Sequence, residues 1–375
     1  MIGGGPGSFI GAIHRIAANM DGLYQLVCGA FSSNPEKSFE TGKDLFLTAS
    51  RIYDNYELLI MTDMSLPDYE RMQVVVIVTP NHVHYHPAKL ALENGFHVII
   101  DKPITLTSAE AVSLKKIAEQ NGLQLCLTHT YTGYPMVKEA RQIIRAGRLG
   151  KVRKVYVEYP QGWLSKFIEA DNQKQAAWRT DPQKSGIAGC MGDIGTHAFN
   201  LSEYVTDLHV TKVCADINIV VEGRKLDDDG AVLLKFNNGA SGVLMATQIA
   251  TGEENNLKIR VFGENGSLQW QQKDNNSLIV KWPDKPCEIL RAGSSYLSEI
   301  ALFNCRTPAG HPEGYLEAFA NHYRNFAIHL NCILDGKPKP DYIEYPTAQE
   351  GIRGMLFIEK VIESSNSEKK WIDFN

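Results

Sequence analysis

The sequence lacks most features that mark disulfide-rich, exported or membrane proteins. Its seven cysteines are scattered over 375 residues without a CxxC pair, which argues against a disulfide framework and fits a reducing compartment. It has no apolar run near the ~20 residues that span a bilayer. It also has no basic N-terminal segment followed by an apolar stretch and a cleavage site. We therefore expect a cytoplasmic protein with no membrane partner.

Positive charge is not in excess either. Lys and Arg number 38 against 43 Asp and Glu, a net charge of −5. Proteins that bind a phosphate backbone carry a basic surplus, so we expect no nucleic-acid partner. Hydrophobic residues make up 43% and charged residues 22%, as in ordinary globular proteins. At roughly 150 residues per domain, the length predicts two to three domains.

The first third of the chain alternates short apolar runs with helix-like stretches, which is typical of βαβ units around a parallel sheet. We expect strands at residues 24–31, 74–79, 97–100 and 123–128, and helices at 9–17, 86–94 and 108–121. This predicts an α/β fold whose N-terminal domain, residues 1–128, is a Rossmann domain with a doubly wound parallel sheet. Only Met1 and Ile2 precede the first glycine turn, so the first strand, ordinarily ~5 residues, should be truncated and the sheet destabilised.

The remainder, residues 129–375, has a different pattern. Strands are expected at 152–159, 231–236, 242–249, 257–262 and 267–271 without helices between them, and helices return at 314–334 and 347–364. We predict a C-terminal α/β domain with a large, mostly antiparallel open sheet. The acidic run at residues 227–229 is interpreted as a solvated turn at a strand entry rather than a metal site.

A glycine-rich turn at residues 3–8 opens the first helix. Such a turn lets backbone N–H groups approach a pyrophosphate at the positive end of a helix. Gly3 and Gly5 match the first two glycines of the dinucleotide fingerprint, and Ser8 stands at its third, close-packing position. A plain tight turn would look similar, but the βαβ context favours a dinucleotide. The residues expected to contact it here are Gly3, Gly5, Pro6, Gly7, Ser8, Phe9 and Ile10.

The choice between NAD and NADP depends on the end of the second strand. An acidic residue usually holds the adenosine ribose there, and residues 30–35 contain none. Ser32, Ser33 and Lys37 could instead hold a 2′-phosphate, although a polar loop has the same composition. The sequence favours NADP and leaves NAD open.

Two further groups of residues could carry chemistry. Lys102 follows a predicted buried strand, at the edge where open α/β sheets bind ligands, although a surface lysine is the commoner case. Asp193 and His197 would share one face of a helix beginning near Gly192, where they could hold and deprotonate a hydroxyl. A capped helix start would also explain them. A metal site is disfavoured, because no companion ligand motif is present and we expect no metal.

These features together resemble the glucose-fructose oxidoreductase, inositol dehydrogenase and rhizopine-catabolism (Gfo/Idh/MocA) family. The likeness covers essentially the whole chain. The matching segments, in the family's order and spacing, are the glycine turn, Thr79-Pro80-Asn81 with His84, Asp101-Lys102-Pro103, Trp178-Arg179 with Asp181, residues 192–197 and residues 346–351.

The resemblance implies site residues. Lys102, Asp193 and His197 match the residues that surround the reacting carbon of a sugar or polyol. Thr79, Pro80, Asn81, His84 and Asp101, with Trp178 and Arg179, match positions on the side of the nicotinamide cofactor. Tyr131, Tyr134 and, in a lid-like loop at residues 306–314, His311 are expected near the substrate. Asp101 stands where relatives carry Glu, and residues 130–135 lack an arginine common in relatives.

The implied function is an NAD(P)-dependent oxidoreductase that moves hydride between nicotinamide and a secondary alcohol or ketone of a cyclic polyol or sugar derivative. Two alternatives remain open: a dinucleotide-binding regulatory protein without turnover, and an NAD-dependent glycoside hydrolase. The small-molecule substrate is the expected partner, and the open sheet of the resemblance implies a homo-oligomer, a dimer or tetramer.

Overall fold

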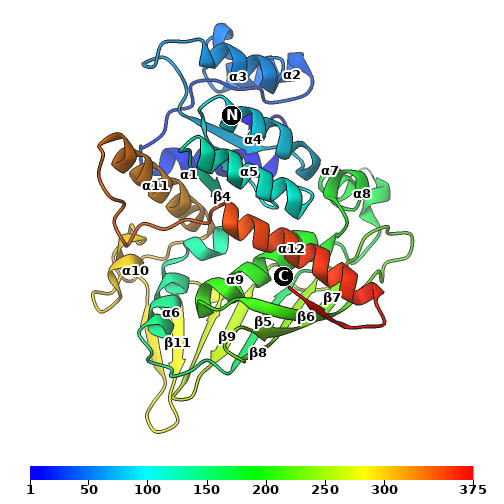
Figure 1. The fold of residues 1–375 in the computed structure, drawn as a ribbon, viewed down its shortest axis with the longest axis vertical. Helices are drawn as coiled ribbons and strands as arrows, with labels where there is room; N and C mark the ends of the chain where they lie inside the picture. Colours follow the sequence, from blue (N-terminus) through cyan, green and yellow to red (C-terminus); the bar gives the residue numbers. More distant parts are fainter. Residues whose placement is uncertain (172, 375) are drawn as a thin grey trace. The chain divides into compact units, whose positions relative to one another are not determined.

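The computed structural model describes residues 1–171 and 173–374, and the chain divides into two compact units (Figure 1). The first unit comprises Met1–Thr130 with Phe319–Ile352, and the second Tyr131–Ala318 with Arg353–Asn375. The first division falls two residues after the expected end at 128. The return of the chain to the first unit was not expected, and it reflects side-chain contacts: the hydroxyl of Tyr323 lies 2.6 Å from Nδ1 of His14.

The first unit is built on a parallel four-stranded sheet in the order β1-β2-β3-β4, which confirms the predicted Rossmann-like core. Residues of β2 and β3 such as Val75, Ile77 and Val98 are fully buried, as expected for strands covered on both faces. Gly95 and Gly122 follow α4 and α5 with positive φ, as helix C-caps require. The elements are β1 (Ile2–Gly3), β2 (Val74–Val78), β3 (His97–Ile100), β4 (Leu125–Leu127), α1 (Phe9–Met20), α2 (Pro35–Asp44), α3 (Tyr56–Met64), α4 (Tyr85–Glu93) and α5 (Ser108–Gln120).

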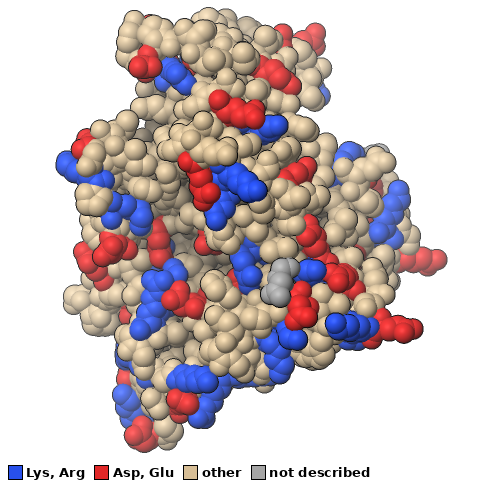
Figure 2. All heavy atoms as spheres, viewed as in Figure 1, with Lys and Arg blue, Asp and Glu red and all other residues tan. Residues whose placement is uncertain are grey.

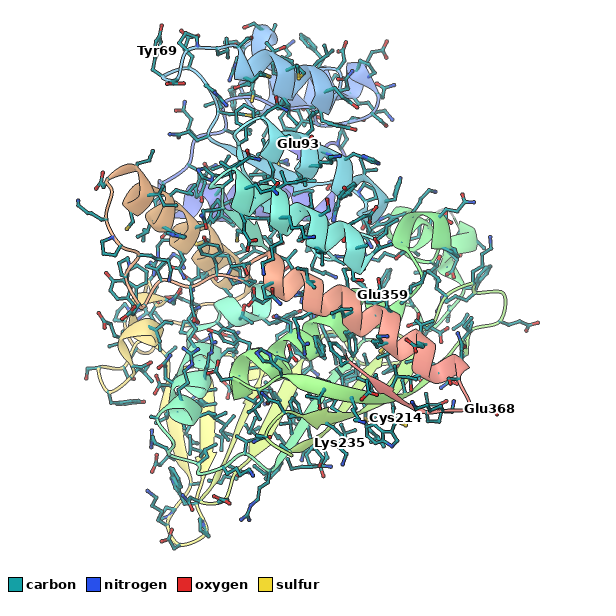
Figure 3. The ribbon with its side chains drawn as sticks, viewed as in Figure 1. Tyr69, Glu93, Cys214, Lys235, Glu359 and Glu368 are labelled. Atoms are coloured by element: carbon teal, nitrogen blue, oxygen red, sulfur yellow. The ribbon has the colours of Figure 1, made fainter. Side chains whose placement is uncertain are left out.

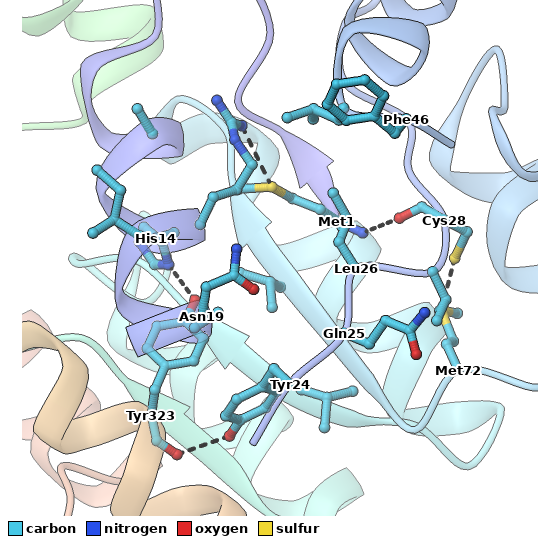
Figure 4. A pocket seen from close by; sticks show the side chains of 18 of the residues that line it. Met1, His14, Asn19, Tyr24, Gln25, Leu26, Cys28, Phe46, Met72 and Tyr323 are labelled. Carbon is cyan, nitrogen blue, oxygen red and sulfur yellow. Dashed lines mark hydrogen bonds between the residues drawn. The ribbon is translucent and has the colours of Figure 1, made fainter. Parts of the chain in front are cut away.

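The predicted strand at 24–31 is wrong in most of its length. Only Gly29 and Ala30 form bridges, to Ile52 and Ile2, because β1 has just two residues and offers the preceding segment nothing to pair with. A cavity of about 430 Å³ lies there instead, lined by residues that include Met1, Cys28 and, on β2, Val74 and Val76 (Figure 4). The Met1 ammonium donates to the carbonyl of Cys28 at 2.8 Å, and burial lowers the pKa of this ammonium.

The second unit contains a nine-stranded sheet in the order β12-β11-β10-β9-β5-β8-β7-β6-β13. Every neighbouring pair is antiparallel except β5–β8, which confirms the predicted mostly antiparallel sheet. Its strands are β5 (Lys154–Pro160), β6 (Val210–Asn218), β7 (Asp229–Phe236), β8 (Ser241–Thr247), β9 (Lys258–Phe262), β10 (Ser267–Gln271), β11 (Ser277–Lys281), β12 (Glu288–Arg291) and β13 (Trp371–Asp373).

Helices cover one face of this sheet. The helices α6 and α9 pack on it side by side, and Phe199 of α9 stacks on Phe357 of α12 with ring centroids 4.6 Å apart (Figure 1). The helices of the second half of the chain are α6 (Pro135–Arg145), α7 (Lys174–Arg179), α8 (Pro182–Ser185), α9 (Thr196–Thr206), α10 (Glu299–Phe303), α11 (Tyr315–Leu334) and α12 (Ala348–Asn366).

The opposite face of the sheet carries exposed apolar side chains. Burial alternates along β7 and along β8. On the outward positions, Leu233 of β7 is 46% exposed and Met245 of β8 is 51% exposed. Cys214 on β6 and Lys235 on β7 lie near the edge of the sheet that β13 forms, and Cys214 pairs with Trp371 of β13 (Figure 3).

Neither sign of charge dominates the visible surface (Figure 2). Acidic and basic side chains are intermixed over the face shown in Figure 2. Within residues 1–171 and 173–374, none of the helices is long and apolar enough to cross a lipid bilayer.

Candidate functional site

In the first unit, the glycine turn leads into the twelve-residue helix α1. Gly3, Gly4 and Gly7 all have positive φ, a conformation that side chains other than glycine rarely adopt. The backbone N–H groups that follow lie at the positive end of α1, which favours an anion. Pro6, Gly7 and Phe9 are exposed beside this turn, with Phe9 at 62%. The residues present therefore fit the pyrophosphate of a dinucleotide.

The close-packing glycine of this turn is not the residue that the sequence predicts. Ser8 is the N-cap of α1, and its Oγ accepts the N–H of Gly11 at 3.2 Å. Gly11 provides the close approach instead, because a Cβ there would lie 2.4 Å from the Cα of Gly4. Gly5 also admits no side chain, since a Cβ would meet the carbonyl oxygen of Phe31 at 2.7 Å before any cofactor is considered.

The predicted phosphate-binding residues lie at the start of α2. Ser33 and Lys37 are exposed, and Ser32 accepts the N–H of Asn34 at 3.1 Å. Asn34 caps α2 by accepting the N–H of Lys37 at 2.9 Å. Two of the three predicted side chains thus face solvent at a helix N-terminus.

His84 lies at the end of the turn that follows β2. It is fully buried, and its ring nitrogens lie 2.7 Å from the carbonyl oxygen of Pro103 and 2.9 Å from that of Thr79. Both ring nitrogens of His84 therefore face backbone carbonyl groups. It joins the turn after β2 to the turn that carries Lys102. Asn81 is also buried, whereas Pro80 is exposed.

Lys102 follows β3 and is partly buried. Its positive charge lowers the pKa of two neighbouring groups, Asp101 and His129. Burial alone would raise the pKa of Asp101, but His14, whose Nε2 lies 3.8 Å from Oδ1 of Asp101, and then Lys102 hold that pKa well below its usual range. Asp101 also accepts the hydroxyl of Thr128 at 2.7 Å. Burial, with the charge of Lys102, lowers the pKa of His129 to about 3. Lys102 is thus a cation within a network of buried polar groups.

In the second unit, Asp193 lies in a π-helical turn, Met191–Gly195, that precedes α9. Its Oδ2 accepts a hydrogen bond from Nε2 of Gln248 at 3.0 Å and lies 3.5 Å from Nε of Arg179. The guanidinium of Arg179 is 4.3 Å from the ring of Trp178. The helix predicted to begin near Gly192 therefore starts with a wider, π-helical turn. The structure also brings Asp193 together with the Trp178-Arg179 pair.

His197, one turn after Asp193, is 8% exposed and packs among tyrosines. Its ring contacts Tyr131 edge-on, with centroids 4.9 Å apart, and Tyr159 at 6.4 Å. The hydroxyls of Tyr131 and Tyr159 share a short hydrogen bond. Burial raises the pKa of both tyrosines, so they remain neutral hydrogen-bonding groups around the imidazole.

A row of amide side chains completes this region. Gln248 Nε2 lies 3.4 Å from Oε1 of Gln161, and Gln161 donates to Oδ1 of Asn255 at 2.6 Å. No pattern in the sequence pointed to these three residues. Gln161 follows β5 and Gln248 follows β8, and these strands are parallel, so both residues emerge at the same edge. Only knowledge of that pairing could have placed them together.

The other predicted substrate residues lie elsewhere in the second unit. Tyr134 is 2% exposed, stacked near Tyr131 and packed on Trp270, which is a core position. His311 is exposed in the 306–314 loop, where its backbone oxygen accepts the hydroxyl of Thr307 at 2.8 Å. Glu313 holds the loop together by accepting the N–H of Thr307 at 2.6 Å.

The carboxylate of Asp193 is surrounded by amides and a guanidinium, and the imidazole of His197 lies one turn further along the chain. Such groups can hold vicinal hydroxyls and move a proton. Among the residues that the structure describes, no cluster of three His, Cys, Asp or Glu side chains could hold a metal ion.

Comparison with known proteins gives both halves of the chain the same family. Residues 1–129 match the oxidoreductase family with an NAD-binding Rossmann fold, and residues 137–269 match the GFO/IDH/MocA C-terminal domain. The uncharacterized oxidoreductase YfiI of Bacillus subtilis is 32% identical over 382 residues, which cover the whole chain and 96% of that protein.

Solved structures agree over the full length. An inositol dehydrogenase homolog from Azotobacter vinelandii, complexed with NAD+, superposes with a TM-score of 0.94 at 33% identity, covering 100% of this chain and 96% of that one. The same homolog has been solved with NADH and myo-inositol, with a TM-score of 0.91, 32% identity and the same coverage. An oxidoreductase from Sinorhizobium meliloti gives 0.89 at 42% identity, covering 99% and 98%. The chain belongs to the Gfo/Idh/MocA family of NAD(P)-dependent oxidoreductases.

Proposed function

We propose that this enzyme transfers hydride between a nicotinamide dinucleotide and a secondary alcohol or ketone of a cyclic polyol or sugar derivative. The observation that carries the proposal is the Asp193 carboxylate, held by Gln248 and Arg179 one turn before His197. This surface suits a molecule with several adjacent hydroxyls. The family membership, and the myo-inositol bound by the Azotobacter vinelandii homolog, support the same substrate class.

The dinucleotide, when bound, supplies the hydride acceptor or donor. In the proposal, residues 3–10 at the start of α1 hold its pyrophosphate. Thr79, Asp101 and, in the second unit, Trp178 and Arg179 contribute to the nicotinamide side.

His197 is the proposed general acid/base. Alcohol oxidation leaves a hydroxyl proton to be removed, and a group with a pKa near the working pH does this best. Histidine ordinarily titrates near ~6.5 and lysine near ~10.4, so the imidazole needs the smaller adjustment. Asp193 orients substrate hydroxyls, and Lys102 polarises the reacting oxygen and stabilises developing alkoxide charge. His197 takes the proton when the alcohol is oxidised and returns it when the ketone is reduced.

For the cofactor, we propose that NADP binds at least as well as NAD, because Ser33 and Lys37 are exposed at the start of α2, where they supply a hydroxyl and a cation for a 2′-phosphate, and residues 30–35 contain no acidic residue. Titration of both dinucleotides into wild type and Lys37→Gln tests this. The variant should lose NADP affinity and keep NAD affinity. Equal affinities of the two proteins for NADP, or a strong wild-type preference for NAD, would refute the assignment.

The function itself is tested by an absorbance screen for the reduced cofactor with inositols, hexoses, sugar acids and amino sugars. Stoichiometric cofactor reduction supports the dehydrogenase. Substrate cleavage without net cofactor change would instead show a glycoside hydrolase, and tight cofactor binding without turnover on the whole panel would show a regulatory protein.

We also propose that the enzyme is a cytoplasmic homo-oligomer, a dimer or tetramer. All seven cysteines are free thiols, which suits a reducing compartment. The exposed apolar residues Leu233 and Met245 make the open sheet face the proposed interface. Light scattering should give an oligomeric mass for wild type and a lower mass for the double variant Leu233→Glu, Met245→Glu. A monomeric wild type would contradict the proposal.

A further inference from the structure

The acidic run at residues 227–229 is not the solvated turn that the sequence predicts. Asp227 is 6% exposed and Asp228 is fully buried. Asp228 accepts the N–H groups of Val220 and Val221 and an ion pair from Arg224 at 3.1 Å, and these contacts explain its burial. Asp227 faces the other way, toward the segment that carries Asp193.

Three hydrogen bonds join Asp227 to residues 189–191, at the start of the π-helical turn. Its Oδ1 accepts the N–H of Gly189 at 2.6 Å, its Oδ2 accepts the N–H of Met191 at 2.7 Å, and its carbonyl oxygen accepts the N–H of Cys190 at 2.8 Å. The approach is close, because a Cβ on Gly189 would lie 2.4 Å from the Asp227 carbonyl oxygen. The carbonyl of Gly189 in turn accepts the N–H of Asp193 at 2.9 Å.

The same strand entry also fixes the hydrogen-bond donor that meets Asp193. The carbonyl oxygen of Asp228 accepts the N–H of Gln248 at 2.9 Å, and Gln248 donates its side-chain amide to Asp193. Two consecutive residues thus hold both partners of the Asp193–Gln248 hydrogen bond. A buried carboxylate that is held by backbone N–H groups is costly to retain for packing alone. Burial raises the pKa of Asp227 to about 6.

We propose that Asp227 is a positioning residue, whose carboxylate fixes residues 189–191 and thereby the location of the Asp193 carboxylate. The inference rests on the proposed function, in which Asp193 orients substrate hydroxyls. Asp227 itself contacts neither substrate nor cofactor. It acts only through the backbone of the π-helical turn.

The test compares Asp227→Asn, Asp193→Asn and the double variant with the wild-type enzyme, at about pH 8, where Asp227 is ionised. An amide retains one acceptor and turns a donor toward the second N–H, so Asp227→Asn should displace the turn. A misplacement of about 1 Å can cost roughly 10²-fold in kcat/KM. We expect that loss for the polyol substrate, with the Kd for NADH unchanged.

The double variant separates positioning from general destabilisation. If Asp227 acts through Asp193, adding Asp227→Asn to Asp193→Asn should lower kcat/KM by less than about threefold, because coupled residues are not additive. A full multiplication of the two losses, or a wild-type rate in Asp227→Asn, would overturn the proposal. Asp229→Asn is the matched control: it removes the neighbouring, partly exposed carboxylate of the same run and should leave the rate unchanged.

Hydrogen exchange gives a readout that needs no turnover. The backbone amides of Gly189 and Met191 should lose protection from exchange in Asp227→Asn and keep it in Asp229→Asn. Unchanged protection in Asp227→Asn would refute the positioning role of Asp227. If Asp227→Asn does not fold, Asp227→Ser, which keeps one acceptor, takes its place with the same expectations. A wild-type enzyme with no activity on any polyol would refute the proposed function. The exchange result would still decide whether Asp227 fixes residues 189–191.

Discussion

The proton-transfer role of His197 leads to the most demanding prediction. Replacing a general acid/base lowers turnover by roughly 10²–10⁴-fold, which at about 1.36 kcal/mol per tenfold is about 2.7–5.4 kcal/mol of barrier. His197→Ala should show a loss in this range. Its affinity for NADH should change little.

The structural damage of the same substitution is smaller. His197 makes an edge-on contact with Tyr131, and such aromatic contacts are worth about 0.5–1.5 kcal/mol. Point substitutions generally destabilise proteins by about 0.5–3 kcal/mol, below the ~5–15 kcal/mol that keeps a protein folded. The variant should therefore stay folded while its chemistry fails, which a melting curve and NADH titration check.

The pH profile of kcat decides between His197 and Lys102 as the proton acceptor. The limb near neutrality should vanish in His197→Ala and persist in Lys102→Met, although Lys102→Met should be at least as slow because it removes the charge that stabilises the alkoxide. The opposite pattern, a limb retained in His197→Ala and lost in Lys102→Met, would move the proton role to Lys102.

Two further predictions concern the first unit. Gly5→Val should abolish dinucleotide binding in a fluorescence titration, because its Cβ would meet the Phe31 carbonyl oxygen at 2.7 Å, and unchanged affinity would show that the turn is misassigned. Asp101→Asn should lower Tm at neutral pH; since the folded pKa of Asp101 is depressed, the difference from wild type should shrink as pH falls below its ordinary value of 3.8, and a constant difference would contradict this.

Local sequence patterns predict a helix or strand well where the periodicity of its own side chains determines it. The apolar runs that form β2 and β3, and the alternation that forms β7 and β8, follow from side-chain periodicity alone. The 24–31 strand fails because a strand needs a partner, and β1 is too short to be one. The run at 227–229 is misjudged because hydrophilicity suggests solvent, whereas backbone N–H groups and Arg224 compensate its burial.

In the candidate site, too, residues close in sequence can be predicted, whereas residues that strand pairing brings together cannot. Asp193 and His197 are close in sequence, so their spacing reveals them. Gln248 lies 55 residues beyond Asp193, directly after β8, and only the parallel pairing of β5 with β8 brings Gln161 and Gln248 to one edge. Gly11 replaces Ser8 as the close-packing residue because the geometry of the turn, rather than the spacing of glycines, decides which Cα approaches Gly4.

The central claim, direct hydride transfer from a polyol carbon, is tested by following an isotope. The enzyme is incubated with oxidised cofactor and an inositol or sugar, found active in the screen, that carries deuterium on its carbinol carbons, and the reduced cofactor is analysed by mass spectrometry. Our account predicts one deuterium in each reduced cofactor molecule formed, together with one equivalent of ketone. Reduced cofactor without deuterium, or substrate consumed with no net reduction of the cofactor, would contradict it.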